Sequence, residues 1–262
     1  MDGSSAVAER PYVAPEKRRR ILGINFFAGS AGEAVDLMLR NRGLLVVPSG
    51  PGMRDLPHRG DYREALLDAD LAIMDSALMV MVWNVMKRDS VKRVSGLEYL
   101  DRLLKEPAFC KSTNTLWIMA SEVSRQRNLE WLACRGVEVD ADHVVIAPVY
   151  KGEIVDPELI KRISTLRPEH IVITIGGGTQ EQLGRYIKTN LDYKPGIHCI
   201  GAAIAFLSGD QVRIPMWADR FYLGWFCRCV SRPARYVPRY WAARGLVGLL
   251  LRYGSELPAK IR

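Results

Sequence analysis

Apolar residues along this chain of 262 residues fall into short runs, and between these runs they recur every three or four positions. The short runs predict buried strands, whereas the longer period predicts helices with one apolar face. Strands that alternate with helices in this way indicate the α/β class. The expected strands are residues 21–26, 44–47, 70–74, 116–120, 143–148, 171–175 and 198–206. The expected helices are residues 33–41, 62–68, 77–86, 124–135 and 156–166, with two more beginning at Gly96 and Thr179.

Asp75 stands at the junction between a buried strand and a long, methionine-rich apolar run that is predicted to be a helix. A carboxylate between two buried elements is costly to desolvate unless it is paired or used. Ligands of open α/β sheets commonly bind at such strand-to-helix junctions. Asp is also a favoured N-cap residue. The spacing therefore leaves two interpretations open, a helix cap and a functional carboxylate.

Two glycine-rich stretches follow predicted strands. Residues 48–53, PSGPGM, predict an irregular loop, which either connects two elements or lets the backbone approach a ligand closely. Residues 176–178 are three consecutive glycines before a helix that Thr179 could cap, and backbone N–H groups at such a turn can face a phosphate. The spacing matches neither the dinucleotide-binding fingerprint nor the Walker A loop.

Arg93 lies just before a helix that Ser95 is expected to cap, with Glu98 at the capping-box position. An arginine at a helix N-terminus can bind an anion, although a solvated surface arginine is the alternative. His143 and His170 lie beside strands without metal-type spacing, so neither receives a role. The five cysteines are odd in number and scattered, which favours reduced thiols in the cytoplasm over disulfides or a metal site.

The charge of the chain is concentrated at its C-terminal end. The whole chain carries +8, and residues 213–262 contain ten basic and two acidic side chains. Aromatic residues alternate with these arginines, which suits a membrane interface. Single-stranded nucleic acid and a helical cap with a solvated basic face are the alternatives. Among these aromatic residues are Trp217, Phe221, Trp225, Tyr236, Tyr240 and Trp241.

Three segments are expected from composition and pattern. Residues 1–20 predict a flexible basic leader without the apolar segment of a signal peptide. Residues 21–212 predict the core, as two closely packed halves with a break near 105–115. Residues 213–262 predict a helical, basic appendage that associates with membranes and can be removed while the core stays folded. No apolar run is long enough to span a bilayer.

From about residue 21 to residue 240, the chain resembles the WecG/TagA/CpsF glycosyltransferases. The family's Asp-Gly-x-Gly-Val-Val element resembles residues 75–80, and its Arg-Val-Thr-Gly-x-Asp element resembles residues 93–98. The Gly-x-Gly-x-Pro-Lys-Gln-Glu turn is similar to residues 176–181. The Arg-Ala-Pro segment and the arginine-rich ending resemble residues 213–215, 224–228, 232–235 and 239–240.

The resemblance implies an α/β fold with a Rossmann-like, mostly parallel sheet and a helical basic C-terminal appendage. It implies an inverting transferase that moves a sugar from a UDP-sugar to a polyprenyl-pyrophosphate-linked acceptor in cell-surface or exopolysaccharide biosynthesis. The expected place is the cytoplasmic face of the inner membrane, where the protein is peripheral and binds the anionic surface. No metal, no cofactor and no nucleic acid are expected as partners, and a homo-oligomer stays open.

The same resemblance implies roles for individual residues. The family's proposed general base corresponds to Asp75, and Arg93 corresponds to a second active-site position. Gly176, Gly178 and Gln180 correspond to the family's glycine turn, with Gln182 as the alternative to Gln180. The family's C-terminal arginines, which stabilise the leaving nucleotide, correspond to Arg228, Arg235 and Arg239.

The chain departs from the family pattern where the sugar is expected. Ser76 replaces a glycine, Gly224 replaces a glutamate, and the family's threonine in the loop after the second strand is Pro48, so that Ser49 would supply the nearby hydroxyl. Family members transfer N-acetylmannosamine, its uronic acid or glucose. The altered loop favours a different hexose, such as glucose.

Overall fold

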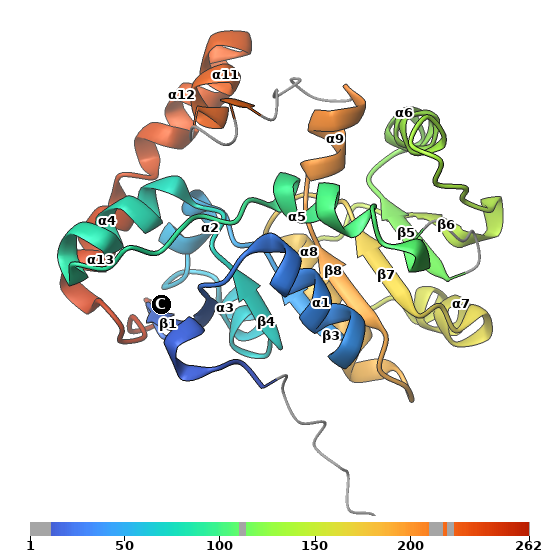
Figure 1. The fold of residues 1–262 in the computed structure, drawn as a ribbon, viewed down its shortest axis with the longest axis horizontal. Coiled ribbons are helices and arrows are strands. Elements are labelled where there is room, and N and C mark those ends of the chain that lie inside the picture. The colour runs from blue at the N-terminus through green and yellow to red at the C-terminus, as the bar shows by residue number, and fades with distance from the viewer. Residues whose placement is uncertain (1–11, 110–113, 210–216, 219–222, 262) are drawn as a thin grey trace, which may run out of the picture.

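The computed structural model describes residues 12–109, 114–209, 217–218 and 223–261. Within these residues, eight strands form one sheet in the order β1-β2-β4-β3-β8-β7-β5-β6 (Figure 1). The hairpin partner β1 is antiparallel to β2, and the other neighbours run parallel. The predicted α/β class with a mostly parallel sheet is confirmed. The strands are β1 Arg18–Ile21, β2 Ile24–Phe27, β3 Gly43–Val46, β4 Leu71–Ile73, β5 Thr115–Met119, β6 Val144–Ile146, β7 His170–Ile173 and β8 Gly196–Cys199.

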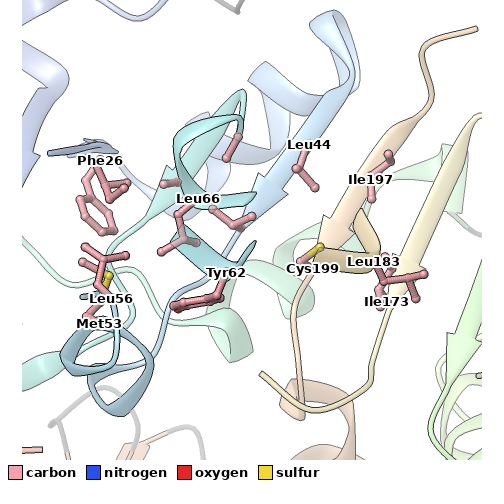
Figure 2. Packing of buried hydrophobic residues seen from close by; sticks show 14 of the residues in the cluster. Phe26, Leu44, Met53, Leu56, Tyr62, Leu66, Ile173, Leu183, Ile197 and Cys199 are labelled. Atoms are coloured by element: carbon pink, nitrogen blue, oxygen red, sulfur yellow. The ribbon is translucent and has the colours of Figure 1, made fainter. Parts of the chain in front are cut away.

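Helices cover both faces of the sheet. Successive residues of each strand point to opposite sides, so both faces carry apolar side chains on which helices pack. Leu44 and Val46 pack into one apolar cluster, whereas Leu45 between them packs into the other. Figure 2 shows the first cluster, in which Leu183 of α8 lies against Ile173 and Ile197 of the sheet. The first face is covered by α2 Gly50–Arg54, α3 Gly60–Leu67, α4 Ala77–Lys87, α7 Pro157–Leu166, α8 Thr179–Asn190 and α13 Gly245–Tyr253. The second is covered by α1 Ala31–Asn41, α5 Gly96–Leu103, α6 Glu122–Ala133 and α9 Ala203–Ser208.

Two further helices, α11 Gly224–Ser231 and α12 Pro233–Ala242, pack on each other beyond the edge of these layers (Figure 1). Short 3₁₀ turns occupy Pro15–Lys17, Pro107–Phe109 and Ala141–His143. The helical C-terminal end expected from the sequence is confirmed. No helix in the described ranges is both long and apolar enough to cross a membrane.

The N-terminal strand differs from the prediction. The expected strand 21–26 is broken by a turn at Leu22 and Gly23, both with positive φ, so that β1 and β2 form a hairpin. Arg18–Arg20 belong to β1 rather than to the flexible leader that was predicted to extend through residue 20. Arg19 is held there by an ion pair with Asp89.

The loop predicted at residues 48–53 contains a helix. Ser49 caps α2 by accepting a hydrogen bond from the N–H of Gly52 at 3.4 Å, and Pro51 lies in the first turn. Proline is tolerated there because the N–H groups of the first turn have no partner within the helix. The prediction of an irregular loop is therefore wrong, although the loop's serine is the residue that starts the helix.

The last predicted strand and one predicted cap also differ. The strand expected at 198–206 ends at Cys199, and α9 begins four residues later. Gly178, rather than Thr179, is the N-cap of α8, and its φ of 94° is accessible to glycine. At both points the chain turns at a glycine with positive φ. Gly178 precedes α8, and Gly201, with a φ of 60°, lies between β8 and α9.

The C-terminal helix belongs to the core. Leu246 and Leu250 of α13 are fully buried in the first apolar cluster, against α4 and α2. The segment after α13 is tied to the β1–β2 turn, because the N–H groups of Leu22 and Gly23 donate to Gly254 and Ser255 at 2.9 Å. The expectation that residues 213–262 can be removed without disturbing the core therefore does not fit the structure.

Candidate active site

Asp75 lies just beyond the carboxyl end of β4, and it does not cap the helix that follows. The N-cap of α4 is Ser76, whose hydroxyl oxygen accepts a hydrogen bond from the N–H of Met79 at 3.3 Å. The cap interpretation of Asp75 is therefore wrong, and its carboxylate is left for other partners.

Arg93 holds the carboxylate of Asp75 in place. Its Nη2 donates to Oδ1 at 3.1 Å, and its Nε donates to the backbone carbonyl of Asp75 at 2.6 Å. The N–H of Gly96 donates to the same Oδ1 at 3.3 Å. The Asp75 side chain is 28% exposed and the Arg93 side chain 12%. Oδ2 is the carboxylate oxygen without a partner among the described residues, so it is available to a ligand.

The local fold explains why residues 18 positions apart meet. The N–H of Val94 donates to the carbonyl of Met74 at 3.1 Å, which fixes the segment before α5 beside the end of β4. Ser95 then caps α5 by accepting from the N–H of Glu98 at 3.0 Å, as its position predicted. A helix N-terminus attracts negative charge, and here it faces the Asp75 carboxylate.

Asp75 and Arg93 lie at the wall of a cavity of about 700 Å³ that is otherwise largely apolar. One side is α4, and the opposite side is formed by α11 and α12. Among the predicted site residues, Ser49, Asp75, Arg93 and Arg228 all line this cavity. The remaining lining residues are Gly50, Pro51, Ser76, Ala77, Leu78, Met81, Gly224, Trp225, Phe226, Cys229, Val237, Tyr240, Trp241, Ala243 and Arg244.

Arg228 reaches the cavity from α11. Its Nη1 donates to the hydroxyl of Tyr240 at 2.9 Å, and its guanidinium carbon lies 4.2 Å from the ring centroid of Phe206. Its Nε is buried and has no hydrogen-bond partner within the described residues. A buried donor without a partner is costly to desolvate. Arg235 and Arg239 belong to α12, but their side chains lie outside what the structure describes.

A second cavity, of about 480 Å³, adjoins the first and shares Ser49 and Pro51 with it. Its lining is polar, and it includes Arg54, Arg59 and Gly177 of the glycine turn. A Cβ at Gly178 would overlap the guanidinium of Arg59, so the glycine lets this arginine approach the turn. The two cavities therefore meet at the loop that carries Ser49.

The glycine turn is held from within the protein. Gln180 is buried, its Oε1 accepts from the N–H of Gly201 at 2.6 Å, and its Nε2 donates to Glu181. The Glu181 carboxylate accepts from the N–H of Gly178 at 2.6 Å, and burial raises the pKa of this carboxyl. Gln182 donates to the Gly178 carbonyl at 2.9 Å. Neither glutamine nor Gly176 lines either of the two described cavities, so their substrate contacts stay predictions.

Several cavity residues had no role in the sequence interpretation. The apolar pattern predicts only a buried helix for Leu78 and Met81, and no motif marks Arg54 or Arg59. The sequence signal for Leu78 and Met81 is that apolar residues of α4 occupy its exposed side as well as its buried side. Among the described residues, no three His, Cys, Asp or Glu side chains come together as metal ligands usually do.

Two buried histidines lie in the sheet. Nδ1 of His170 lies 3.2 Å from Nε2 of His198, and Nδ1 of His198 lies 2.8 Å from the Tyr99 hydroxyl. Burial, with a smaller effect of Arg42, lowers the pKa of His170 to about 4. Burial also lowers the pKa of His198, and His170 adds to this effect. Neither histidine lines the cavities, so both belong to the core.

The Asp75 carboxylate is fixed at the end of a parallel strand, beside one apolar and one polar cavity. Open α/β sheets commonly bind their ligands at this place, outside the carboxyl ends of the strands. The sequence profile of the glycosyl transferase WecG/TagA/CpsF family matches residues 19–259, and the chain belongs to this family. A relative from Bacillus spizizenii, N-acetylglucosaminyldiphosphoundecaprenol N-acetyl-beta-D-mannosaminyltransferase, is 24% identical over 210 residues. The match covers 77% of this chain and 78% of the relative. The predicted family and the glycosyltransferase class are confirmed.

Proposed function

We propose that this glycosyltransferase moves a sugar from a UDP-sugar to a polyprenyl-diphosphate-linked acceptor, with inversion at the anomeric carbon. The observation that carries the proposal is the Asp75 carboxylate, which is fixed through Oδ1 and lies at an apolar cavity that arginines also line. The relative's name supports the acceptor class, because that protein acts on a diphosphoundecaprenol-linked sugar. The reaction would take place at the cytoplasmic face of the inner membrane, in cell-surface or exopolysaccharide biosynthesis.

In this mechanism, Oδ2 of Asp75 accepts the proton of the acceptor hydroxyl as the hydroxyl oxygen attacks the anomeric carbon. The new bond joins that oxygen to the anomeric carbon, and the bond between the anomeric carbon and the UDP diphosphate breaks. Arg93 positions the base through Oδ1. Arg228, with Arg235 and Arg239, stabilises the negative charge that develops on the leaving diphosphate.

The polar cavity is the proposed place of the donor. Arg59 and Arg54 supply positive charge to a diphosphate there, and Gly177, an exposed residue of the glycine turn, lines the same cavity. Ser49, which lines both cavities, would contact the sugar between them. Arg54 already pairs with Asp55, so Arg59 is the stronger candidate for the diphosphate.

The sugar is proposed to be a hexose such as glucose, with N-acetylmannosamine and its uronic acid as the other candidates. The support is the altered loop at Pro48 and Ser49. The decisive experiment incubates the full-length protein with N-acetylglucosaminyl diphosphoundecaprenol and a panel of UDP-sugars, with products read by mass spectrometry. One hexosyl unit added from one donor supports the proposal. No mass increase with any donor on this or other lipid-diphosphate acceptors would overturn it.

Metal independence is part of the same proposal. The leaving diphosphate would be stabilised by arginine side chains, so transfer should continue at an unchanged rate in excess EDTA. The measurement is the initial rate of transfer with and without the chelator. Loss of activity in EDTA that Mg²⁺ or Mn²⁺ restores would contradict this part.

A further inference from the structure

The helix that follows Asp75 carries an unusual apolar stripe. Leu78, Met81 and Val85 of α4 are spaced three and four residues apart, so they lie along one side of the helix. Exposure rises along this stripe, from half-buried Leu78 to 52% at Met81 and 82% at Val85. The opposite side of α4 packs into the core through Met79, Val80 and Trp83, and the stripe is therefore not needed to hold the helix in place.

Aromatic residues face this stripe across the cavity. Trp225 and Phe226 of α11 and Trp241 of α12 line the same cavity as Leu78 and Met81. These three aromatic side chains are 48%, 52% and 64% exposed. Large apolar side chains gathered at a cavity mouth mark a place where an apolar partner binds.

Arginine side chains line the same cavity. Arg93 and Arg228 line it together with Asp75, and Arg244 lines it at the start of α13. The guanidinium carbon of Arg244 lies 3.1 Å from the ring centroid of Trp241. Because Arg228 is assigned to the leaving diphosphate of the donor, Arg93 and Arg244 supply the positive charge for the diphosphate of the acceptor. The stripe, whose exposure rises away from Asp75, forms an apolar track for the chain attached to that diphosphate.

We propose that the Leu78–Met81–Val85 stripe of α4, with Trp225 and Trp241, binds the first isoprene units of the lipid acceptor and makes the enzyme select acceptors that carry such a chain. This inference rests on the proposed function. It assigns the isoprenoid chain, rather than a bilayer lipid, to the stripe, because the stripe continues directly from the residues beside the Asp75 carboxylate. An acceptor with the same sugar and diphosphate but no chain would leave the track in contact with water.

The test measures binding of farnesyl diphosphate and of inorganic diphosphate to the full-length protein by isothermal titration calorimetry, without detergent. Farnesyl diphosphate should bind at least about tenfold more tightly than inorganic diphosphate, because only the former buries apolar area. Met81→Ser should weaken farnesyl diphosphate binding about fivefold with inorganic diphosphate binding unaffected, and Trp241→Ala should weaken farnesyl diphosphate binding about tenfold. Val123→Ser is the matched control, since Val123 is 58% exposed on α6, on the far side of the molecule from α4 (Figure 1).

Equal binding of the two ligands, or wild-type farnesyl diphosphate binding by both Met81→Ser and Trp241→Ala, would overturn the inference. If the stripe binds the bilayer surface instead, these variants should lose binding to phosphatidylglycerol vesicles but keep farnesyl diphosphate binding. That result would also overturn the inference. The assay is separable from the proposed function, because it needs no sugar transfer. If farnesyl diphosphate binds as expected but no donor yields product, the proposed function fails and the isoprenoid track stands.

Discussion

Asp75 is a candidate site residue because of three residues that follow it in the chain. Ser76 takes the capping role at α4, so the carboxylate is left for Arg93 and Gly96. From spacing alone, a helix cap and a functional carboxylate are equally open interpretations of Asp75, because both aspartate and serine cap helices well. The resemblance pointed to Asp75 and Arg93, but their pairing depends on where the chain returns after α4. That return is a tertiary feature, which local pattern does not contain.

Arg228 provides the first test at this scale. Replacing it with alanine should lower kcat/KM for sugar transfer about 10²–10³-fold, because a donor aimed at developing negative charge would be lost. Arg232→Ala is the control, since Arg232 is exposed and does not line the described cavities. Initial rates and thermal unfolding midpoints of both variants check the prediction. A wild-type rate for Arg228→Ala in a folded protein would remove this residue from the mechanism.

At the scale of elements, helix caps were predictable and glycine-rich turns were less so. Ser95 caps α5 as its position predicted, because a capping side chain acts within one turn. The helix α2 was missed, since Pro51 and two glycines usually indicate a loop. The end of β8 was also missed, because the apolar run continues unbroken from the strand into α9.

The basic C-terminal end illustrates the same limit. Its arginines and aromatic residues favoured a detachable appendage, yet the apolar residues of α13 pack on α4 and complete the core. Composition does not distinguish a membrane-facing apolar helix from one that faces the protein. In α13 the two faces are occupied by neighbouring leucines, Leu250 fully buried and Leu251 65% exposed.

These two leucines make a matched pair for a stability measurement. Leu250→Ala should lower the free energy of unfolding by about 2–5 kcal/mol, through lost apolar burial and a cavity. Leu251→Ala should change it by less than about 0.5 kcal/mol, because exposed substitutions cost little. Urea unfolding followed by circular dichroism would give both values. Equal effects of the two substitutions would show that α13 is not part of the core.

At the scale of the whole molecule, the sheet brings the site together. The parallel strands β3, β4 and β7 all end at one edge, so Ser49, Asp75 and the glycine turn lie around the same two cavities (Figure 1). The C-terminal helices α11 and α12 cover this edge and lie beyond the two helical layers that flank the sheet. The α/β class was predictable from alternating patterns, whereas the closing arrangement of α11 and α12 was not, since it depends on contacts with α2 and the anchoring of α13.

The buried histidines make the stability of the whole fold depend on pH. Burial lowers the pKa of His170 to about 4 in the folded protein, whereas an unfolded histidine titrates near 6.5. Between these values the unfolded chain binds more protons, so the free energy of unfolding should fall as the pH drops from about 6.5 to 4. The loss from this residue should reach roughly 3 kcal/mol.

Denaturant unfolding of wild type and His170→Gln between pH 7.5 and 4.5 checks this dependence. The variant should be less sensitive to acid than the wild type. His58→Gln replaces an exposed histidine and should keep the wild-type profile. If His170→Gln and the wild type lose stability in parallel over this window, the buried pair does not cause the acid sensitivity.

The central claim is that Asp75 is the general base of sugar transfer, and Asp75→Asn tests it most directly. The amide oxygen can still accept from Arg93 and Gly96, so the variant keeps the local geometry but loses the basic carboxylate. The measurement is the initial rate of transfer from the active UDP-sugar to the lipid-linked acceptor, with Asp61→Asn at an exposed position as control. We expect Asp75→Asn to be slower by about 10²–10⁴-fold, with unchanged UDP affinity and unfolding midpoint. A rate close to that of the wild type would contradict the account.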